Sequence, residues 1–225
     1  KGIFKLSLNK DLLIEKKDTL ELTKVNEFLN IKNLNINQIN NFITQIFTKD
    51  IRNKITEITG FNFSIDFIIF YERKFIPLKL REVSTLKQPY SYRWHFDKPN
   101  SSNMLKIFIP LDINDDSGPL EVINKSDSKN INNFRKISSS KKTITFKGKG
   151  DRIYGFNPTI CCHRDGIPKK NIYANQIMFQ LNPNKKWVIN SRLCKKESFI
   201  KKIGIWTTEP KFPHLSYLFD ERISF

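Results

Sequence analysis

The sequence is poor in the residues that mark several common classes of protein. It has three cysteines in 225 residues, Cys161 and Cys162 side by side and Cys194 apart from them. This odd set argues against a disulfide framework, so we expect a reducing, cytoplasmic location. No apolar run approaches the roughly 18 residues that a membrane-spanning helix needs. The first residues contain no apolar stretch of the kind found in signal peptides, so we expect no such leader.

Acidic residues are also scarce, which makes the chain strongly basic. There are 22 Asp and Glu against 39 Lys and Arg, a formal net charge of +17. The excess is densest in residues 125–149 and 185–202. A basic protein attracts polyanions, but neither stretch interleaves aromatic residues with arginine as a single-strand binding groove does. We therefore expect solvated loop and tail surfaces in preference to a nucleic-acid face.

Apolar residues are abundant enough for a substantial core. They make up 39% of the chain, and 19 of them are Phe, which excludes a disordered protein. The length suits one large domain. We expect a single domain over residues 1–225, with a helical N-terminal layer (1–60), a core of strands (61–183) and a basic C-terminal extension (184–225).

The first sixty residues have the periodicity of helices. Residues 18–21 provide a capping pattern, and apolar residues near one helical face follow as far as residue 29. A firmer amphipathic pattern covers residues 39–47. A short third helix is predicted at 51–58, with Gly60 as its C-terminal stop.

From residue 61 the pattern changes to short β-rich runs separated by turn residues. Many short strands at such spacing are typical of an antiparallel sandwich or jelly roll and not of an alternating β/α protein. The predicted strands are 63–71, 90–96, 105–111, 120–122, 142–146, 152–155, 159–163 and 172–181.

Two of the three histidines lie in patterns that indicate a metal site. His95 and Asp97 are two residues apart, so on a strand they would project from one face. With the distant His163 they would make the two-histidine, one-carboxylate triad of non-haem Fe(II) oxygenases, which leaves metal positions open for a cosubstrate and O₂. The His-x-Asp pair alone is equally consistent with an ion pair on a strand surface.

The surrounding motifs favour the metal site. An aliphatic strand ending in Leu-Asp (104–112), a Gly-Pro-Leu-Glu-Val-Ile strand (118–123), a Gly-Lys-Gly-Asp turn (148–151) and His-Arg-Asp-Gly-Ile-Pro (163–168) follow in order. This order resembles the phytanoyl-CoA dioxygenase-like branch of the Fe(II)/2-oxoglutarate-dependent oxygenases. The resemblance covers residues 90–183.

The resemblance implies a mostly β protein with flanking helices, a double-stranded β-helix (jelly roll, cupin-like) backed by the N-terminal helices. It implies Fe(II) held by His95, Asp97 and His163, with 2-oxoglutarate and O₂ as cosubstrates. Such an enzyme couples decarboxylation of 2-oxoglutarate to succinate with oxidation of a second compound. We expect hydroxylation of a small molecule.

The chain departs from this family at the residue that binds the distal carboxylate of 2-oxoglutarate. Relatives usually have an arginine there, shortly after the distal histidine, and this chain has Ala174. Burying a dianion without a cation is costly. Lys106 is the preferred replacement, because it resembles the lysine of the Jumonji-type branch, and Arg93 is the second candidate. Gln176 and Gln180 share the strand parity of Ala174, which indicates a polar cavity that would contact the cosubstrate.

Three other functions stay open at this point. One is a cupin-like metalloenzyme that does not use 2-oxoglutarate, which the missing arginine favours. The others are a non-catalytic basic binding module on the same barrel and an oxygenase that acts on nucleic acid. A zinc site at Cys161, Cys162 and His163 is disfavoured, because it lacks a second pair of ligands.

Overall fold

The computed structural model describes residues 2–8, 22–32, 34, 36–82, 90–97, 102–131, 134, 137, 142–190 and 222–224. None of the helices in these ranges is long and apolar enough to cross a membrane. In chain order the elements are β1 (Ile3–Ser7), β2 (Leu22–Asn26), β3 (Leu29–Lys32), α1 (Ile36–Ile46), α2 (Lys49–Thr59), β4 (Asn62–Arg73), α3 (Leu78–Glu82), β5 (Leu105–Leu111), β6 (Leu120–Ile123), α4 (Lys125–Ser128), β7 (Thr143–Phe146), β8 (Arg152–Phe156), β9 (His163–Arg164), β10 (Ala174–Asn184), β11 (Val188–Asn190) and β12 (Arg222–Ser224).

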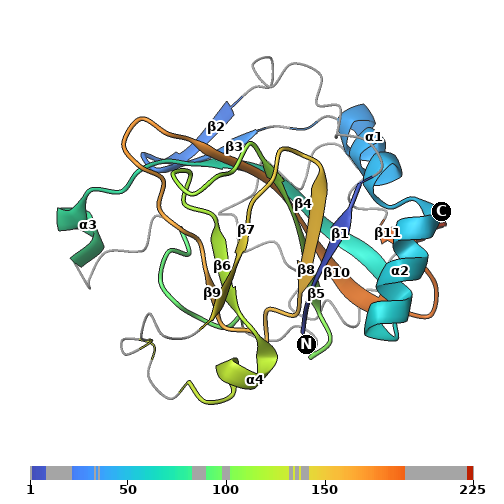
Figure 1. Cartoon of the computed structure of the whole chain (residues 1–225). Helices are drawn as coiled ribbons and strands as arrows, with labels where there is room; N and C mark the ends of the chain where they lie inside the picture. The colour runs from blue at the N-terminus through green and yellow to red at the C-terminus, as the bar shows by residue number, and fades with distance from the viewer. Residues whose placement is uncertain are drawn as a thin grey trace.

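The strands form two sheets that face each other (Figure 1). The major sheet has the order β1-β8-β5-β10-β4-β11-β12, and the β2–β3 hairpin joins it through β3 and β4. The minor sheet has the order β7-β6-β9. The described strands pair antiparallel, except β11 with β4. This architecture is the predicted double-stranded β-helix.

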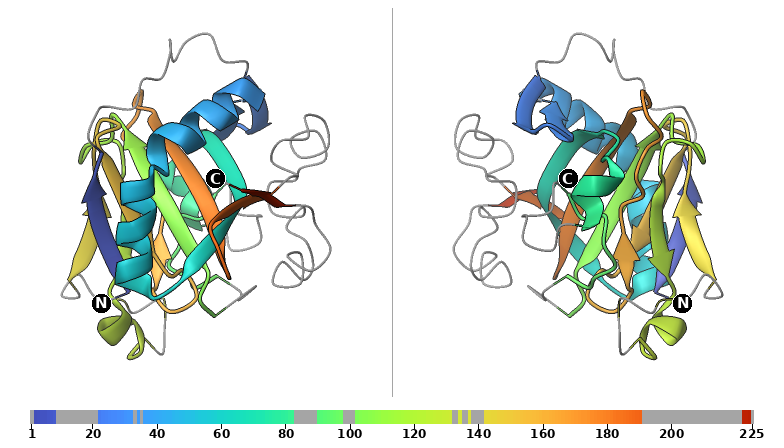
Figure 2. Two further views of the ribbon diagram at one scale, coloured as in Figure 1. Left: turned by 90° about the vertical axis from the view of Figure 1, so that its right-hand side faces the viewer. Right: turned by 90° about the vertical axis from the view of Figure 1, so that its left-hand side faces the viewer.

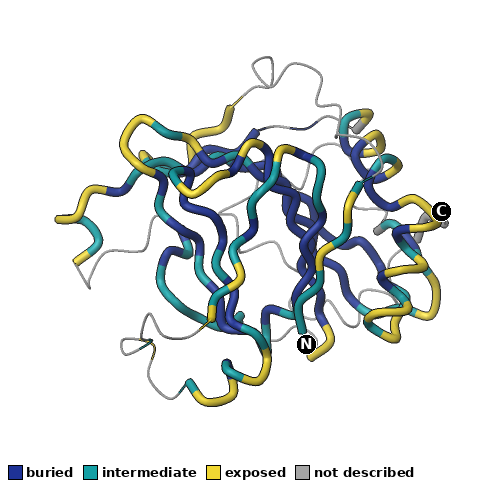
Figure 3. The backbone as a smooth tube through the Cα atoms, viewed as in Figure 1, coloured by how far each residue is buried: buried dark blue, intermediate teal, exposed yellow. Residues whose placement is uncertain are grey.

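The long central strands β4 and β10 are buried on both faces, as Figure 3 shows. On the outer face, Ile177 and Phe179 of β10 pack with Phe70 of β4 against the helices. On the inner face, Met178 and Tyr71 belong to a second apolar cluster, which includes residues of the minor sheet. Alternate residues therefore face different cores, which explains the near-continuous apolar sequence of both strands.

Helices α1 and α2 cover the outer face of the major sheet (Figure 2). Ile46 and Ile55 of these helices and Phe47, which lies between them, are buried and complete the outer core. The Thr48 side chain caps α2 by accepting a hydrogen bond from the Ile51 backbone N–H at 3.3 Å. Gly60 ends the helix in the left-handed conformation, with φ of 80°. Both helices predicted at 39–47 and 51–58 are confirmed.

The predicted helix at residues 18–29 is wrong where the structure describes it. Residues 22–32 form the β2–β3 hairpin, and β3 pairs antiparallel with the end of β4. Leu29 and Ile31 alternate into the inner core, and this packing on a sheet edge outweighs the weak helical periodicity. The proposed capping residues 18–21 lie outside the described residues.

Two predicted strands around the site are shorter than expected. In residues 90–96 only His95 forms a bridge, because Tyr92 N–H bonds to the Tyr90 carbonyl and turns the chain. Residues 159–162 are not part of a strand, so β9 has only two residues. The other strands predicted within 61–183 are confirmed. Beyond residue 184 the structure describes β11, β12 and the residues before β11, and residues 191–221 lie outside it.

Two motif glycines fix β9 against the start of β6. The Gly166 N–H donates to the Pro119 carbonyl at 3.2 Å. A Cβ on Gly166 would lie 2.6 Å from the Gly118 carbonyl carbon, and one on Gly118 would lie 2.4 Å from the Ile167 carbonyl carbon. Gly118 also has φ of 61°. Only glycine allows this backbone contact, which holds the segment that carries His163.

We expect Gly118→Ala to destabilise the fold more than Gly60→Ala. Both glycines have positive φ, but nothing lies within 4 Å of a Cβ on Gly60. The Gly60 substitution should cost about 1–2 kcal/mol from backbone strain. The Gly118 substitution should cost a further 1–3 kcal/mol or so, because its methyl group overlaps the backbone of residue 167. Urea unfolding of both variants measures the difference, and equal losses would contradict the glycine contact.

Candidate metal centre

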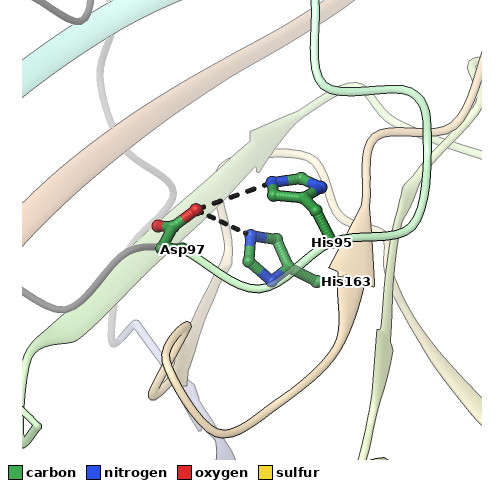
Figure 4. A group of neighbouring side chains, drawn as sticks. All are labelled: His95, Asp97 and His163. Atoms are coloured by element: carbon green, nitrogen blue, oxygen red, sulfur yellow. Dashed lines mark ion pairs between the residues drawn. The ribbon is translucent and has the colours of Figure 1, made fainter. Parts of the chain in front are cut away.

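Three side chains that can bind a metal converge inside the barrel (Figure 4). The Nε2 atoms of His95 and His163 each lie 3.5 Å from Oδ1 of Asp97. All the candidate ligand atoms lie within 4.8 Å of one another. Among the described residues this is the only group of three or more His, Cys, Asp and Glu side chains that has such spacing. It is the triad to which the sequence pointed.

A backbone bridge brings the two imidazoles together. The His95 N–H donates to the His163 carbonyl and the His163 N–H donates to the His95 carbonyl, both at 3.0 Å. The two ring centroids are 4.3 Å apart. A further bond, from the Asp97 N–H to the Pro158 carbonyl at 3.0 Å, holds the carboxylate residue. The three ligands are thus positioned by main-chain hydrogen bonds and do not depend on side-chain packing alone.

Each histidine is oriented through its other ring nitrogen. Nδ1 of His95 lies 2.8 Å from the Arg93 carbonyl oxygen, and Nδ1 of His163 lies 3.0 Å from the Cys161 carbonyl oxygen. A nitrogen that faces a carbonyl oxygen carries a proton, so Nδ1 is protonated in each ring and Nε2 is the nitrogen that can offer an electron pair to a metal. Two such nitrogens and a carboxylate oxygen repel one another unless a cation lies between them. The donor set therefore fits a divalent metal such as iron.

The electrostatics keep Asp97 ionised. Burial by itself raises its pKa, but Lys106 and the two histidines outweigh burial and lower it. Lys106 is the strongest of these partners, with Nζ 2.5 Å from Oδ2 of Asp97. Burial lowers the pKa of His163, in spite of the opposing effect of Asp97. At neutral pH the site thus has a charged carboxylate and a neutral buried imidazole, which are the forms that bind metals.

The surroundings close one side of the triad. The His163 side chain is 4% exposed, against 30% for His95. The Phe156 ring packs edge-on against His163, with centroids 4.9 Å apart. On the other face of β9, Arg164 forms hydrogen bonds with both carboxylate oxygens of Glu121 on β6. Access to a metal bound here would come from the side of His95.

The other residues proposed from the sequence have separate positions. Lys106 is buried and paired with Asp97. Arg93 donates a hydrogen bond to the Arg81 carbonyl at 3.1 Å. Gln176 is fully buried, and its Nε2 contacts the Tyr71 hydroxyl and lies 3.4 Å from Oδ1 of Asp165. The roles of these residues in cosubstrate binding stay predictions.

Sequence reasoning named Gln176 but missed the three residues that surround it in an inner polar cluster, defined here as Tyr71, Arg73, Asp165 and Gln176. Arg73 is 0% exposed, and its Nη1 donates to the Gly166 carbonyl. Its Nε lies 3.6 Å from Oδ1 of Asp165. A signal was present, because Arg73 follows an apolar strand in the same alternation as Tyr71. Burial, helped by the Asp165 carboxylate, raises the pKa of Tyr71, so its hydroxyl stays protonated.

Comparisons with known proteins identify the fold. No protein family matches the chain, and no curated protein sequence matches it. Among solved structures, SnoN, the non-heme alpha-ketoglutarate-dependent epimerase from nogalamycin biosynthesis, is similar at a TM-score of 0.52 and 9% identity, over 81% of this chain and 78% of SnoN. HygX from Streptomyces hygroscopicus, with nickel and 2-oxoglutarate bound, is similar at a TM-score of 0.51 and 7% identity, over 82% of this chain and 84% of HygX.

At these identities the likeness concerns the fold. The chain has the double-stranded β-helix that the resemblance to the Fe(II)/2-oxoglutarate oxygenase superfamily implied. The phytanoyl-CoA dioxygenase-like branch stays a prediction.

We expect Ni(II), a redox-inert probe, to stabilise the protein through the triad. A ligand that binds only the folded state at 100 times its Kd adds about 2.7 kcal/mol of stability. His163→Ala and Asp97→Asn should abolish the resulting rise in Tm. Asp116→Asn is the matched control, because Asp116 is an exposed partner of Lys169. A full nickel-dependent rise in the Tm of His163→Ala would contradict a metal centre at these residues.

Proposed function

We propose that this protein is a non-haem Fe(II)/2-oxoglutarate-dependent oxygenase that oxidises a small molecule, with hydroxylation as the reaction. The observation that supports this most is the convergence of His95, Asp97 and His163 inside a double-stranded β-helix. HygX, which has the same fold, was solved with nickel and 2-oxoglutarate bound. SnoN is an alpha-ketoglutarate-dependent epimerase. The choice of hydroxylation over another oxidation is therefore tested only once a substrate is known.

In this proposal the residues of the chain hold and tune the metal. His95 and His163 would supply Nε2, and Asp97 would supply a carboxylate oxygen. Lys106 keeps Asp97 charged and neutralises part of its buried charge. The Arg93 carbonyl oxygen accepts a hydrogen bond from Nδ1 of His95, and the Cys161 carbonyl oxygen accepts one from Nδ1 of His163, which fixes the orientation of both rings. Iron bound there would supply the redox chemistry that couples keto-acid decarboxylation to substrate oxidation.

Buried polar atoms in the barrel support a polar cosubstrate beside the triad. Oε1 of Gln176 and Oε1 of Gln180 are buried without a hydrogen-bond partner among the described residues. Both glutamines lie on the inner face of β10, because Ile177 and Phe179, which alternate with them along the strand, face the outer core. Buried polar atoms are normally satisfied. Both orphan atoms are acceptors, so the partners they need are donors such as water molecules, which a polar cosubstrate site holds and an apolar one does not.

A second candidate is a metalloenzyme on the same barrel that does not use 2-oxoglutarate. Ala174 favours it, because this residue provides no cation where the resemblance to the oxygenases expects one. The two candidates differ in whether the protein converts 2-oxoglutarate to succinate.

We expect the Fe(II)-loaded protein, supplied with O₂ and with ascorbate as reductant, to convert 2-oxoglutarate slowly to succinate and CO₂ even without its natural substrate. One oxygen atom of O₂ enters succinate, and ascorbate supplies the two electrons that release the other as water. Loss of a residue that only orients a metal ligand reduces activity about 10–100-fold. His163→Ala removes a ligand itself and should reduce succinate formation by more than this. Succinate is measured by mass spectrometry, with Asp116→Asn as the active control. Absence of succinate from protein that binds iron would contradict the proposal and favour the second candidate.

A further inference from the structure

Arg73 is a buried cation, and some of its N–H groups have no acceptor among the described residues. It lies at the end of β4 and is 0% exposed. Nη1 donates to the Gly166 carbonyl, but Nε and Nη2 have no hydrogen-bond acceptor among the described residues. The Asp165 carboxylate, 3.6 Å from Nε, is an ion partner beyond hydrogen-bond distance. A guanidinium with this many unpaired N–H groups is strongly disfavoured in a protein interior unless it meets a further anion.

The register of the sheet places Arg73 beside the position that lacks an arginine. Arg73 and Ala174 are directly opposite each other on β4 and β10. Side chains of such a pair lie on the same face with Cβ atoms about 4.5–5.5 Å apart. Ala174 is 0% exposed and has only a methyl group as its side chain. The guanidinium of Arg73 therefore comes from the neighbouring strand into the space that a long side chain at 174 would occupy.

The cluster also lies at a suitable distance from the metal ligands. Asp165, which contacts Arg73, is two residues after His163. Two residues of extended chain span about 7 Å. The two carboxyl carbons of a five-carbon keto acid are about 5 Å apart when extended, given carbon–carbon bonds of about 1.5 Å. A keto acid with its 2-oxo end at the triad is thus long enough for its distal carboxylate to approach the cluster that contains Arg73.

The remaining members of the cluster suit a carboxylate. The Tyr71 hydroxyl accepts a hydrogen bond from Gln176, so its own proton remains available for donation. Nη2 of Arg73 is a second unused donor. Asp165 faces Nε and leaves the Nη2 edge of the guanidinium open. From the Nε side, the Asp165 carboxylate offsets part of the buried charge of Arg73.

Lys106 and Arg93 fit this role less well. Lys106 is already paired with Asp97, so moving it to a cosubstrate would leave a metal ligand without its compensating charge. Arg93 donates to the Arg81 carbonyl, and its guanidinium lies 5.6 Å from the Tyr92 ring centroid.

We propose that Arg73, supplied by β4, binds the distal carboxylate of 2-oxoglutarate and makes the site selective for dicarboxylic 2-oxo acids. This inference rests on the proposed function and names the residue that completes its cosubstrate site.

A double-mutant cycle between protein and ligand tests the assignment. The probes are 2-oxoglutarate and 2-oxopentanoate, which has the same carbon chain without the distal carboxylate, titrated calorimetrically into the Ni(II)-loaded protein. The wild type should prefer 2-oxoglutarate by about 100-fold, the effect of one buried charge pair. Arg73→Gln should lose this preference while its affinity for 2-oxopentanoate changes only a few-fold. Arg152→Gln, at a half-exposed arginine paired with Asp151, is the matched control and should keep it.

Relocating the arginine keeps the test valid if Arg73→Gln folds poorly. Arg73→Gln combined with Ala174→Arg returns the guanidinium to the opposite strand and should recover most of the preference for the dicarboxylate. Arg73→Lys keeps the charge and should retain part of it. Nickel binding, measured separately, reports whether each variant retains the triad.

Two results would overturn the assignment of Arg73 while leaving the proposed function intact. One is an unchanged preference for 2-oxoglutarate in every folded Arg73 variant. The other is loss of the preference in Lys106→Gln but not in Arg73→Gln. A wild-type protein that binds nickel but neither keto acid would instead contradict the proposed function itself, and with it the cosubstrate role of Arg73.

Discussion

The site depends on one antiparallel backbone bridge between residues that are far apart in the sequence. His95 and His163 exchange two main-chain hydrogen bonds of 3.0 Å, and this exchange brings their rings together. Asp97 then reaches both rings from the same segment, because it is two residues beyond His95. Any change that slides β9 along its neighbours would move one imidazole away from the carboxylate. The surrounding structure can be understood as a set of restraints on that bridge.

Those restraints come from both sides of β9. The Gly118–Gly166 contact fixes its end, and the ion pair of Arg164 with Glu121 fixes its outer face to β6. A strand of two residues has little pairing energy of its own. These contacts therefore supply the stability that keeps β9, and with it His163, in position. The motif glycines therefore have a mechanical explanation. They allow two backbones to approach more closely than any side chain would permit, and the metal ligands keep their positions as a result.

Much of the fold and of the candidate triad could be predicted from the sequence, because both depend on local sequence patterns. Alternating or continuous apolar runs predicted β4, β5 and β10, and the His-x-Asp spacing predicted that two ligands share a face. The β2–β3 hairpin was missed because residues 22–32 become strands only by pairing with β4. The strand at 90–96 was overpredicted, because a local turn at Tyr92 interrupts it.

The alternation along β4 gave a signal that Arg73 faces the interior, but the role proposed for it could not be predicted from the sequence, because that role depends on the register of the sheet. Ala174 and Arg73 are 101 positions apart in the numbering and become neighbours only when β10 pairs with β4. That pairing contains a register shift between Gln180 and Leu181, so an alignment from the other end of the two strands would place the wrong residue opposite Ala174. The net charge of +17 gives no help either, since most cations of a basic protein are solvated. A single buried arginine has more consequence for an anionic cosubstrate than the whole surface excess, because the interior screens its charge so little.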